Sequence, residues 1–208
     1  MVIIMVSVEI ITVGPLETNC YLVCEGKDCL VVDPGDEAET ILTILGNRRV
    51  LAVVATHLHF DHIGAVEGIV SSTGAPFMVH RLDWEMRDKY TQLARSWGFE
   101  PPNLPQPIFI DEGSGLPFNL KVMHTPGHTP GSISIVGDGF VLTGDTLFAG
   151  SVGRTDLPGG DIELLIRSIC RLYRELPGNY IVYPGHGPPT TINDEADNNY
   201  FVPKSLCT

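Results

Sequence analysis

The chain has 208 residues, of which 43% are hydrophobic and 18% are charged. This composition is typical of a globular protein and excludes a disordered one. The net charge of −12 at pH 7 argues against nucleic acid and membrane surfaces as partners, because both are anionic and repel an acidic protein. The length fits one domain over residues 1–208, with one large core or two packed layers.

Two features of the sequence predict a cytoplasmic protein. The apolar N-terminus, residues 1–8, is too short to cross a bilayer and lacks the basic region of a secretory signal, so we interpret it as the start of the first strand. The five cysteines, at positions 20, 24, 29, 170 and 207, are odd in number and show no C-x-x-C spacing. This pattern favours reduced, mostly buried thiols.

The first half of the chain alternates short apolar runs with helical patterns. In chain order we predict strands over 8–13, 19–24 and 29–32, a helix between Asp36 and Gly46, a strand over 50–55, a helix from Asp61 to Gly74, a strand over 77–80 and a helix over 83–97. The first three strands should pair as an antiparallel meander. Asp36 is the expected N-cap of its helix, and the valine-rich run 50–55 indicates a strand buried on both faces.

The second half repeats this order after a proline-rich loop that ends at Pro107. We predict strands over 120–123, 132–136 and 140–143, a helix from the cap Asp161 to near Pro177, and a last strand over 180–183. Strands followed by helices in both halves indicate two packed sheets with helices outside. The predicted fold is therefore of the α/β (α+β) class, a four-layer αββα sandwich.

The strongest chemical signal lies directly after the buried run 50–55. The segment 56–62, Thr-His-Leu-His-Phe-Asp-His, holds three of the seven histidines. Imidazole nitrogens and carboxylate oxygens are ligands for zinc, iron and manganese, whereas a nucleophilic triad would need a serine or cysteine in the segment. The candidate metal ligands here are His57, His59, Asp61 and His62.

Three further residues of the same kind follow apolar runs beside a glycine, where the backbone can approach a metal closely. They are His128, Asp145 and His186. Taken alone, each histidine can be a loop residue bonded to a carbonyl, and the aspartate can be a turn former. Four strand ends that carry ligand-type residues in one chain indicate a shared metal centre.

The whole set of motifs resembles the metallo-β-lactamase superfamily: the H-x-H-x-D-H run, a later single histidine, the aspartate of Gly-Asp-Thr and the terminal Pro-Gly-His. The segments 125–132 (TPGHTPGS), 144–148 (GDTLF) and 153–156 (GRTD) resemble the glyoxalase II group, the hydroxyacylglutathione hydrolases, in their short form without the C-terminal helical domain. This resemblance implies the αββα metallo-β-lactamase fold with the site at one edge between the sheets. It also implies hydrolysis of a thioester such as S-(2-hydroxyacyl)glutathione by a metal-bridging hydroxide.

The resemblance further implies a role for each ligand. One cation would be bound by His57, His59 and His128, the second by Asp61, His62 and His186, and Asp145 would bridge both. Asp61 can also orient the nucleophile, so Asp61 and Asp145 are the candidate catalytic residues. The expected cofactors are two divalent metal ions per chain, zinc first, with iron or manganese as alternatives for such an all-nitrogen and oxygen ligand set.

The substrate implied is a small anionic thioester. Two divalent cations, two carboxylates and a hydroxide leave a local charge of about +1, which suits an anion. Arg154, in a glycine-flanked loop, is the candidate to bind a substrate carboxylate, and the alternative is a salt bridge to Asp156. Asp33, Thr56 and Thr129 are candidates to hold the imidazoles in place.

A second enzyme class fits the same motifs. A persulfide dioxygenase of this fold would place one iron on His57, His128 and Asp145, a two-histidine, one-carboxylate set with open positions. Metal content per chain and oxygen uptake distinguish the two enzymes. His80 and His124 match no ligand position, and we interpret His124 as structural.

Overall fold

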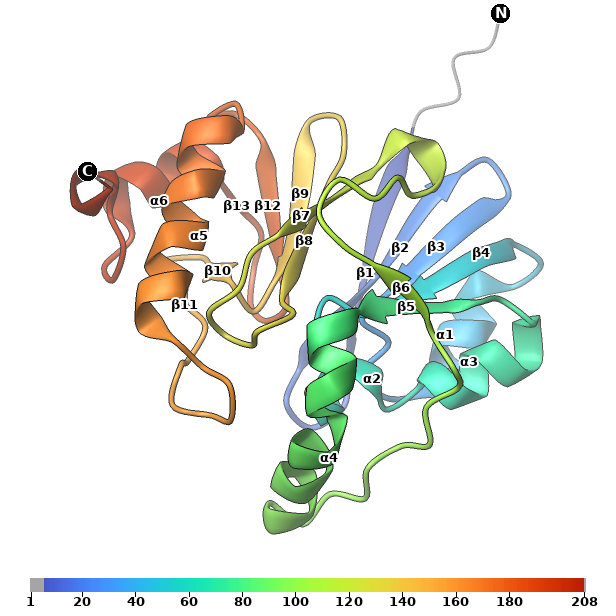
Figure 1. Ribbon diagram of the computed structural model, residues 1–208. Coiled ribbons are helices and arrows are strands. Elements are labelled where there is room, and N and C mark those ends of the chain that lie inside the picture. Colours follow the sequence, from blue (N-terminus) through green and yellow to red (C-terminus); the bar gives the residue numbers. More distant parts are fainter. Residues whose placement is uncertain (1–5, 208) are drawn as a thin grey trace, which may run out of the picture.

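The computed structural model describes residues 6–207 (Figure 1), and within them two sheets carry the fold. The first sheet contains β1 (Ser7–Val13), β2 (Thr18–Glu25), β3 (Asp28–Val32), β4 (Arg49–Val54), β5 (Phe77–His80) and β6 (Ile108–Ile110), in that order. β1, β2 and β3 pair as the predicted antiparallel meander, and β3 to β6 pair in parallel. Parallel neighbours need crossover connections, and helices lie in all three of these, α4 in the last one.

The second sheet has the order β13-β12-β9-β8-β7. Its strands are β7 (Lys121–His124), β8 (Ile133–Val136), β9 (Phe140–Gly144), β12 (Ile181–Pro184) and β13 (Thr190–Thr191), and a separate ribbon joins β10 (Leu147–Phe148) to β11 (Ser151–Val152). The helices are α1 (Ala38–Leu45), α2 (Phe60–Ile63), α3 (Val66–Thr73), α4 (Arg81–Ser96), α5 (Ile162–Glu175) and α6 (Ile192–Asn198), with 3₁₀ turns η1 (Pro117–Asn119) and η2 (Lys204–Leu206). Within residues 6–207, no helix has both the length and the apolarity that a membrane crossing requires.

The four predicted layers are confirmed by three apolar clusters. One cluster lies between the first sheet and α1, α3 and α4, one between the two sheets, and one between the second sheet and α5 and α6. β2 shows how the sequence builds two of them: Cys20 and Leu22 face the helices, whereas Tyr21 and Val23 face the other sheet. Alternate residues of a strand point to opposite faces, so a strand covered on both sides is apolar throughout.

Two helix predictions need correction. The first helix begins at Ala38 with Glu37 as its N-cap, in a left-handed conformation (φ 56°), and the predicted cap Asp36 instead accepts the Glu37 N–H at 2.7 Å. The helix predicted from Asp61 to Gly74 is two helices, α2 and α3, separated at Gly64. A side chain at Gly64 would collide with the carbonyl of Gly35, so the chain is pressed against the β3–α1 loop at this point. Asp161 does cap α5, as predicted.

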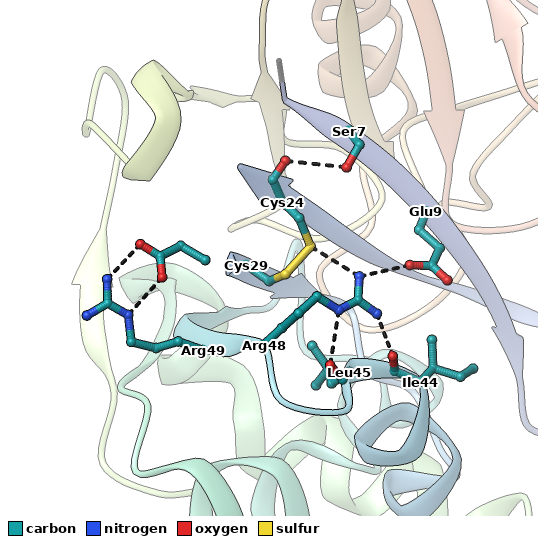
Figure 2. The surroundings of a disulfide bond; sticks show 9 residues. Ser7, Glu9, Cys24, Cys29, Ile44, Leu45, Arg48 and Arg49 are labelled. Atoms are coloured by element: carbon teal, nitrogen blue, oxygen red, sulfur yellow. Dashed lines mark hydrogen bonds and ion pairs between the residues drawn. A yellow bond between two sulfur atoms is a disulfide. The ribbon is translucent and has the colours of Figure 1, made fainter. Parts of the chain in front are cut away.

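The prediction of reduced thiols is wrong for four of the five cysteines. Cys24 and Cys29 are register partners on β2 and β3 and form a disulfide (Figure 2). The guanidinium of Arg48 lies beside it, with Nη1 3.6 Å from the Cys24 sulfur and 3.0 Å from a carboxylate oxygen of Glu9. Directly opposite strand positions lie close enough for such a bond, but the sequence does not reveal the register.

A second disulfide joins Cys170 on α5 to Cys207, 37 residues later. Cys20 is a buried thiol, and burial raises its pKa well above the ordinary value. With two disulfides present, cysteine content no longer supports a cytoplasmic location. Residues 1–5, which we expected to begin the first strand, lie outside the described part of the chain.

Candidate metal centre

The seven predicted ligands all follow strand ends at one edge of the two sheets. His57 and His59 lie between β4 and α2, and α2 itself carries Asp61 and His62. His128 lies in the loop between β7 and β8, Asp145 directly follows β9, and His186 is the second residue after β12. β9 and β12 are parallel, so Asp145 and His186 emerge at the same edge. Residues that lie up to 129 positions apart therefore meet in space.

The side chains form two groups of three. The first group is His57, His59 and His128, and the second group is Asp61, His62 and His186. Within each group, one ligand atom from every residue lies within 4.8 Å of the other two. In the first group, His59 Nδ1 and His128 Nε2 are 2.8 Å apart. In the second group, a carboxylate oxygen of Asp61 lies 3.2 Å from His186 Nε2 and 3.6 Å from His62 Nε2.

Asp145 lies between the two groups. Its Oδ1 is 3.3 Å from His62 Nε2, whereas its Oδ2 is 3.5 Å from His128 Nε2 and 3.7 Å from His186 Nε2. One carboxylate thus faces both sets of nitrogens, which is the placement a bridging ligand needs.

Four imidazoles are oriented through their second nitrogen. Nδ1 of His128 donates to the Arg154 carbonyl at 2.7 Å, and Nδ1 of His186 donates to the Leu16 carbonyl at 3.0 Å. A proton fixed on Nδ1 leaves the Nε2 lone pair free toward the centre. Such bonds fix the tautomer and ring orientation of metal-binding histidines.

Asp33 organises the other two oriented rings. Its carboxylate accepts both the N–H and the O–H of Thr56, each at 2.6 Å, and lies 3.0 Å from His62 Nδ1. The Thr56 hydroxyl, whose proton goes to Asp33, lies 3.2 Å from His57 Nδ1 and can accept from it. Asp33 and Thr56 therefore hold imidazoles as expected, whereas the Thr129 hydroxyl contacts Ser132 instead.

The chemistry of the donor set fits divalent cations. Within residues 6–207, only five buried side-chain polar atoms lack a hydrogen-bond partner, and four of them belong to this centre: Nε2 of His57, His59 and His62, and Oδ1 of Asp145. Buried polar groups are almost always paired. Four orphaned atoms from two adjoining clusters therefore indicate that cations complete them.

The protonation states point the same way. Burial lowers the pKa of His57 and lowers that of His59 to about 3, so both rings are neutral at pH 7. Burial would also lower the pKa of His62, but the carboxylates of Asp145 and Asp61 outweigh it and raise that pKa. Burial likewise would raise the pKa of Asp145, yet the nearby His62 lowers it well below its ordinary value. A positive charge is thus favoured among these carboxylates, and a divalent cation can replace a proton there.

The sequence matches a protein-family model and two named relatives. The family model described as "Metallo-beta-lactamase superfamily" matches residues 13–186. The chain belongs to this superfamily. It is 36% identical over 211 residues to the hydroxyacylglutathione hydrolase GloC of Haemophilus influenzae, covering 94% of this chain and 98% of GloC. It is also 36% identical over 199 residues to the probable metallo-hydrolase YqgX of Bacillus subtilis, covering 91% and 94%.

The fold of the chain also matches that of a solved structure. The crystal structure of TTHA1623 in a di-iron-bound form is 42% identical, with a TM-score of 0.88, and the match covers 93% of this chain and 100% of that one. The predicted fold and superfamily are therefore confirmed, and the chain is a metallo-β-lactamase-fold protein with histidine and aspartate clusters suited to metal.

A cavity of about 380 Å³ opens onto the candidate ligands of this metallo-β-lactamase fold. Its walls are mostly apolar: Leu16, Phe60, Leu93, Trp97, Phe148, Val152 and Leu157. Arg154 also lines it, and its Nε and Nη2 both reach the Asp156 carboxylate at 2.7 Å. The ion pair with Asp156, the alternative interpretation of Arg154, is therefore present, and the residue also lies beside the candidate site.

Several residues at the site were not identified from the sequence. The Thr18 hydroxyl donates to Asp61 at 3.2 Å, and no motif marks this strand residue. A side chain at Gly185 would collide with the Asp145 carboxylate, so glycine is needed before His186. Asp83 is buried in α4 on the same face as Tyr90 and Ala94, and that helical spacing was the one available signal. His80 and His124 lie apart from the candidate ligands and stack with ring centroids 4.3 Å apart.

Proposed function

We propose that the protein is a dinuclear metal-dependent hydrolase that cleaves small anionic thioesters, with S-(2-hydroxyacyl)glutathione as the substrate class. The observation that carries this proposal is the pair of three-residue groups with Asp145 between them, together with the buried Nε2 atoms of His57, His59 and His62 and the Asp145 Oδ1 that lack hydrogen-bond partners. The similarity to GloC supports the substrate class. Glutathione is a thiol of the cytosol, and a cytoplasmic location is part of the proposal.

The seven residues would hold the cations as the family resemblance implies: His57, His59 and His128 for one, Asp61, His62 and His186 for the other, with Asp145 shared. Two cations so held would lower the pKa of a water toward about 7 and polarise a carbonyl oxygen. Zinc suits this nitrogen and oxygen set, and iron is the alternative that the di-iron form of TTHA1623 supports.

The protein side chains supply orientation around that chemistry. We assign Asp61 the role of orienting the attacking water, because the Thr18 hydroxyl at 3.2 Å fixes one carboxylate oxygen at the cavity wall. A thioester releases a stable thiolate, so the reaction needs little general-acid help. The protein therefore mainly has to place the thioester carbonyl beside the attacking water.

The cavity walls and Arg154 would bind and position the substrate. The ion pair with Asp156 uses Nε and Nη2 of Arg154 and fixes the plane of its guanidinium, which also lies 5.7 Å from the Trp97 ring. The remaining nitrogen, Nη1, takes no part in that pair and suits a substrate carboxylate. The apolar walls suit the carbon chain next to the scissile bond.

The decisive experiment measures turnover of S-D-lactoylglutathione and metal content in one purified sample. We expect hydrolysis, which is monitored as the loss of thioester absorbance. We also expect two metal ions per chain. His59→Ala and Asp145→Ala should abolish turnover, whereas the control His80→Ala, which lies apart from the ligands, should keep most of it.

The same sample tests the persulfide dioxygenase alternative. That enzyme would contain one iron per chain and consume oxygen with glutathione persulfide. The complete second group, in which the Nε2 atoms of His62 and His186 both lie within 3.6 Å of one Asp61 oxygen, favours the hydrolase. One iron with oxygen uptake and no thioester hydrolysis would overturn the proposal.

A further inference from the structure

A carboxylate outside the seven candidate ligands joins the two loops of the first group. Asp83 lies in the first turn of α4 and is fully buried. Its Oδ2 accepts the Leu58 N–H at 2.8 Å, and its Oδ1 accepts the Gly131 N–H at 2.6 Å. A single side chain therefore connects the loop after β4 with the loop between β7 and β8.

Both contacts are made close to the histidines. Leu58 lies between His57 and His59, and Gly131 lies three residues after His128. A side chain at position 131 would meet the Asp83 carboxylate at 2.6 Å, so glycine at this position permits the approach. The loops are also joined at a second point, where the Ile133 N–H donates to the Thr56 carbonyl at 3.0 Å.

The same helix contacts the ligands a second time. Tyr90, on the face of α4 that carries Asp83, packs edge-on against the His59 ring with centroids 4.9 Å apart. The first group is thus supported by α4 at two points.

The second group is held by other parts of the chain. Asp61 is fixed by Thr18, His62 by Asp33, and His186 by the Leu16 carbonyl. Asp83 makes no hydrogen bond to this group among the described residues. Loss of Asp83 should therefore affect the two groups unequally.

We propose that Asp83 is a positioning residue that sets the spacing of His57, His59 and His128 and thereby the metal affinity of the first group. The proposal rests on the metal centre of the proposed function, but not on its substrate. Charge-assisted bonds to backbone N–H groups are strong, and a buried N–H left without its acceptor destabilises the arrangement that contains it. Freed from Asp83, the two loops would no longer keep His59 Nδ1 and His128 Nε2 at 2.8 Å.

The test is Asp83→Asn, which keeps the shape but has one oxygen in place of two, so it cannot accept both N–H groups. Zinc dissociation constants are measured by chelator competition in two backgrounds. His186→Ala leaves the first group intact, and His128→Ala leaves the second intact. Changes in groups that orient metal ligands alter affinity by about 10- to 100-fold. We expect Asp83→Asn to weaken zinc binding about 10-fold or more in the first background and less than about threefold in the second.

Glu195→Gln is the matched control. Glu195 is another buried carboxylate that accepts a backbone N–H, that of Gly150 at 2.9 Å, and it connects α6 to the β10–β11 turn. Its other hydrogen bonds among the described residues are to Thr190 and Asn199, not to a candidate ligand. We expect it to lower the melting temperature of the metal-free protein without changing zinc affinity. Unchanged affinity in Asp83→Asn, or an equal loss in both backgrounds, would overturn the proposal.

A measurement on the wild-type protein covers the case in which Asp83→Asn does not fold. Amide hydrogen exchange of Leu58 and Gly131 should stay slow after zinc is removed with a chelator, because the carboxylate and not the metal holds both N–H groups. Rapid exchange of these two amides in the folded, metal-free protein would overturn the proposal. Neither measurement uses a thioester, so a failed substrate assignment leaves this test intact.

Discussion

The Cys170–Cys207 disulfide should stabilise the fold more than the Cys24–Cys29 disulfide. The bonds span 37 and 5 residues, respectively. In the chain-entropy account, closing loops of these lengths in the unfolded chain stabilises the folded state by about 4 and about 2 kcal/mol. The longer loop also contains β12, His186 and α6, so the larger effect falls on a segment that contributes to the metal centre.

The assay is chemical unfolding of the metal-free protein without reductant, comparing the two double variants Cys170→Ala/Cys207→Ala and Cys24→Ala/Cys29→Ala. Removal of the long-range bond should lower the free energy of unfolding by about 2 kcal/mol more than removal of the hairpin bond. Wild-type protein treated with reductant should lose about as much as both variants together, because it loses the same bonds and keeps the sulfur atoms. An equal loss in the two variants, or a larger loss in the hairpin variant, would refute the loop-length reasoning.

Three further predictions concern the site. Asp33→Asn should weaken zinc binding by the second group about 10- to 100-fold, measured by chelator competition, because its carboxylate orients His62. Arg154→Ala should raise the KM for S-D-lactoylglutathione about 10-fold with little change in kcat, as expected for lost substrate binding; an unchanged KM would remove Arg154 from the substrate site. Burial raises the pKa of Asp83 from 3.8 to about 6, so the folded protein binds the Asp83 proton more tightly than the unfolded chain does. This proton stabilises the folded state by about 3 kcal/mol below pH 4, and the stabilisation is lost as the pH rises through 6. The difference in unfolding free energy between wild type and Asp83→Asn, both metal-free, should fall by about that amount between pH 4 and 7; a constant difference would show that Asp83 ionises normally.

The candidate ligands could be found from the sequence because their signal is local. Each lies just beyond an apolar run, so one short segment of sequence shows both the buried strand and the ligand at its end. The run 50–55 followed by His57 is an example. The sandwich was predictable for a related reason, because β2 and β4 are apolar on both faces and so need a layer on each side. Asp161 was identified as a cap because the cap and the helix it begins are adjacent in the chain.

The features that were missed depend on contacts between distant parts of the chain. Asp83 looks like an ordinary polar residue early in a helix, and only the packing of α4 against two loops makes it a buried acceptor. The disulfide of Cys170 requires the C-terminal segment to return to α5, which local patterns do not report. Strands β10, β11 and β13 have two residues each, too few for any periodicity to appear.

The charge distribution indicates how an anionic substrate would lie. The protein carries a net charge of −12, so anions are repelled over most of its surface. Among the described residues that line the 380 Å³ cavity, Arg154 is the only lysine or arginine. Its carbonyl also accepts the His128 N–H at 2.7 Å, so the residue that would bind the anionic end is tied through its backbone to a candidate ligand. A carboxylate held at Arg154 would therefore direct the rest of the substrate along the cavity wall toward His128 and Asp145. The distance between the carboxylate and the thioester of a substrate would then decide which substrates fit.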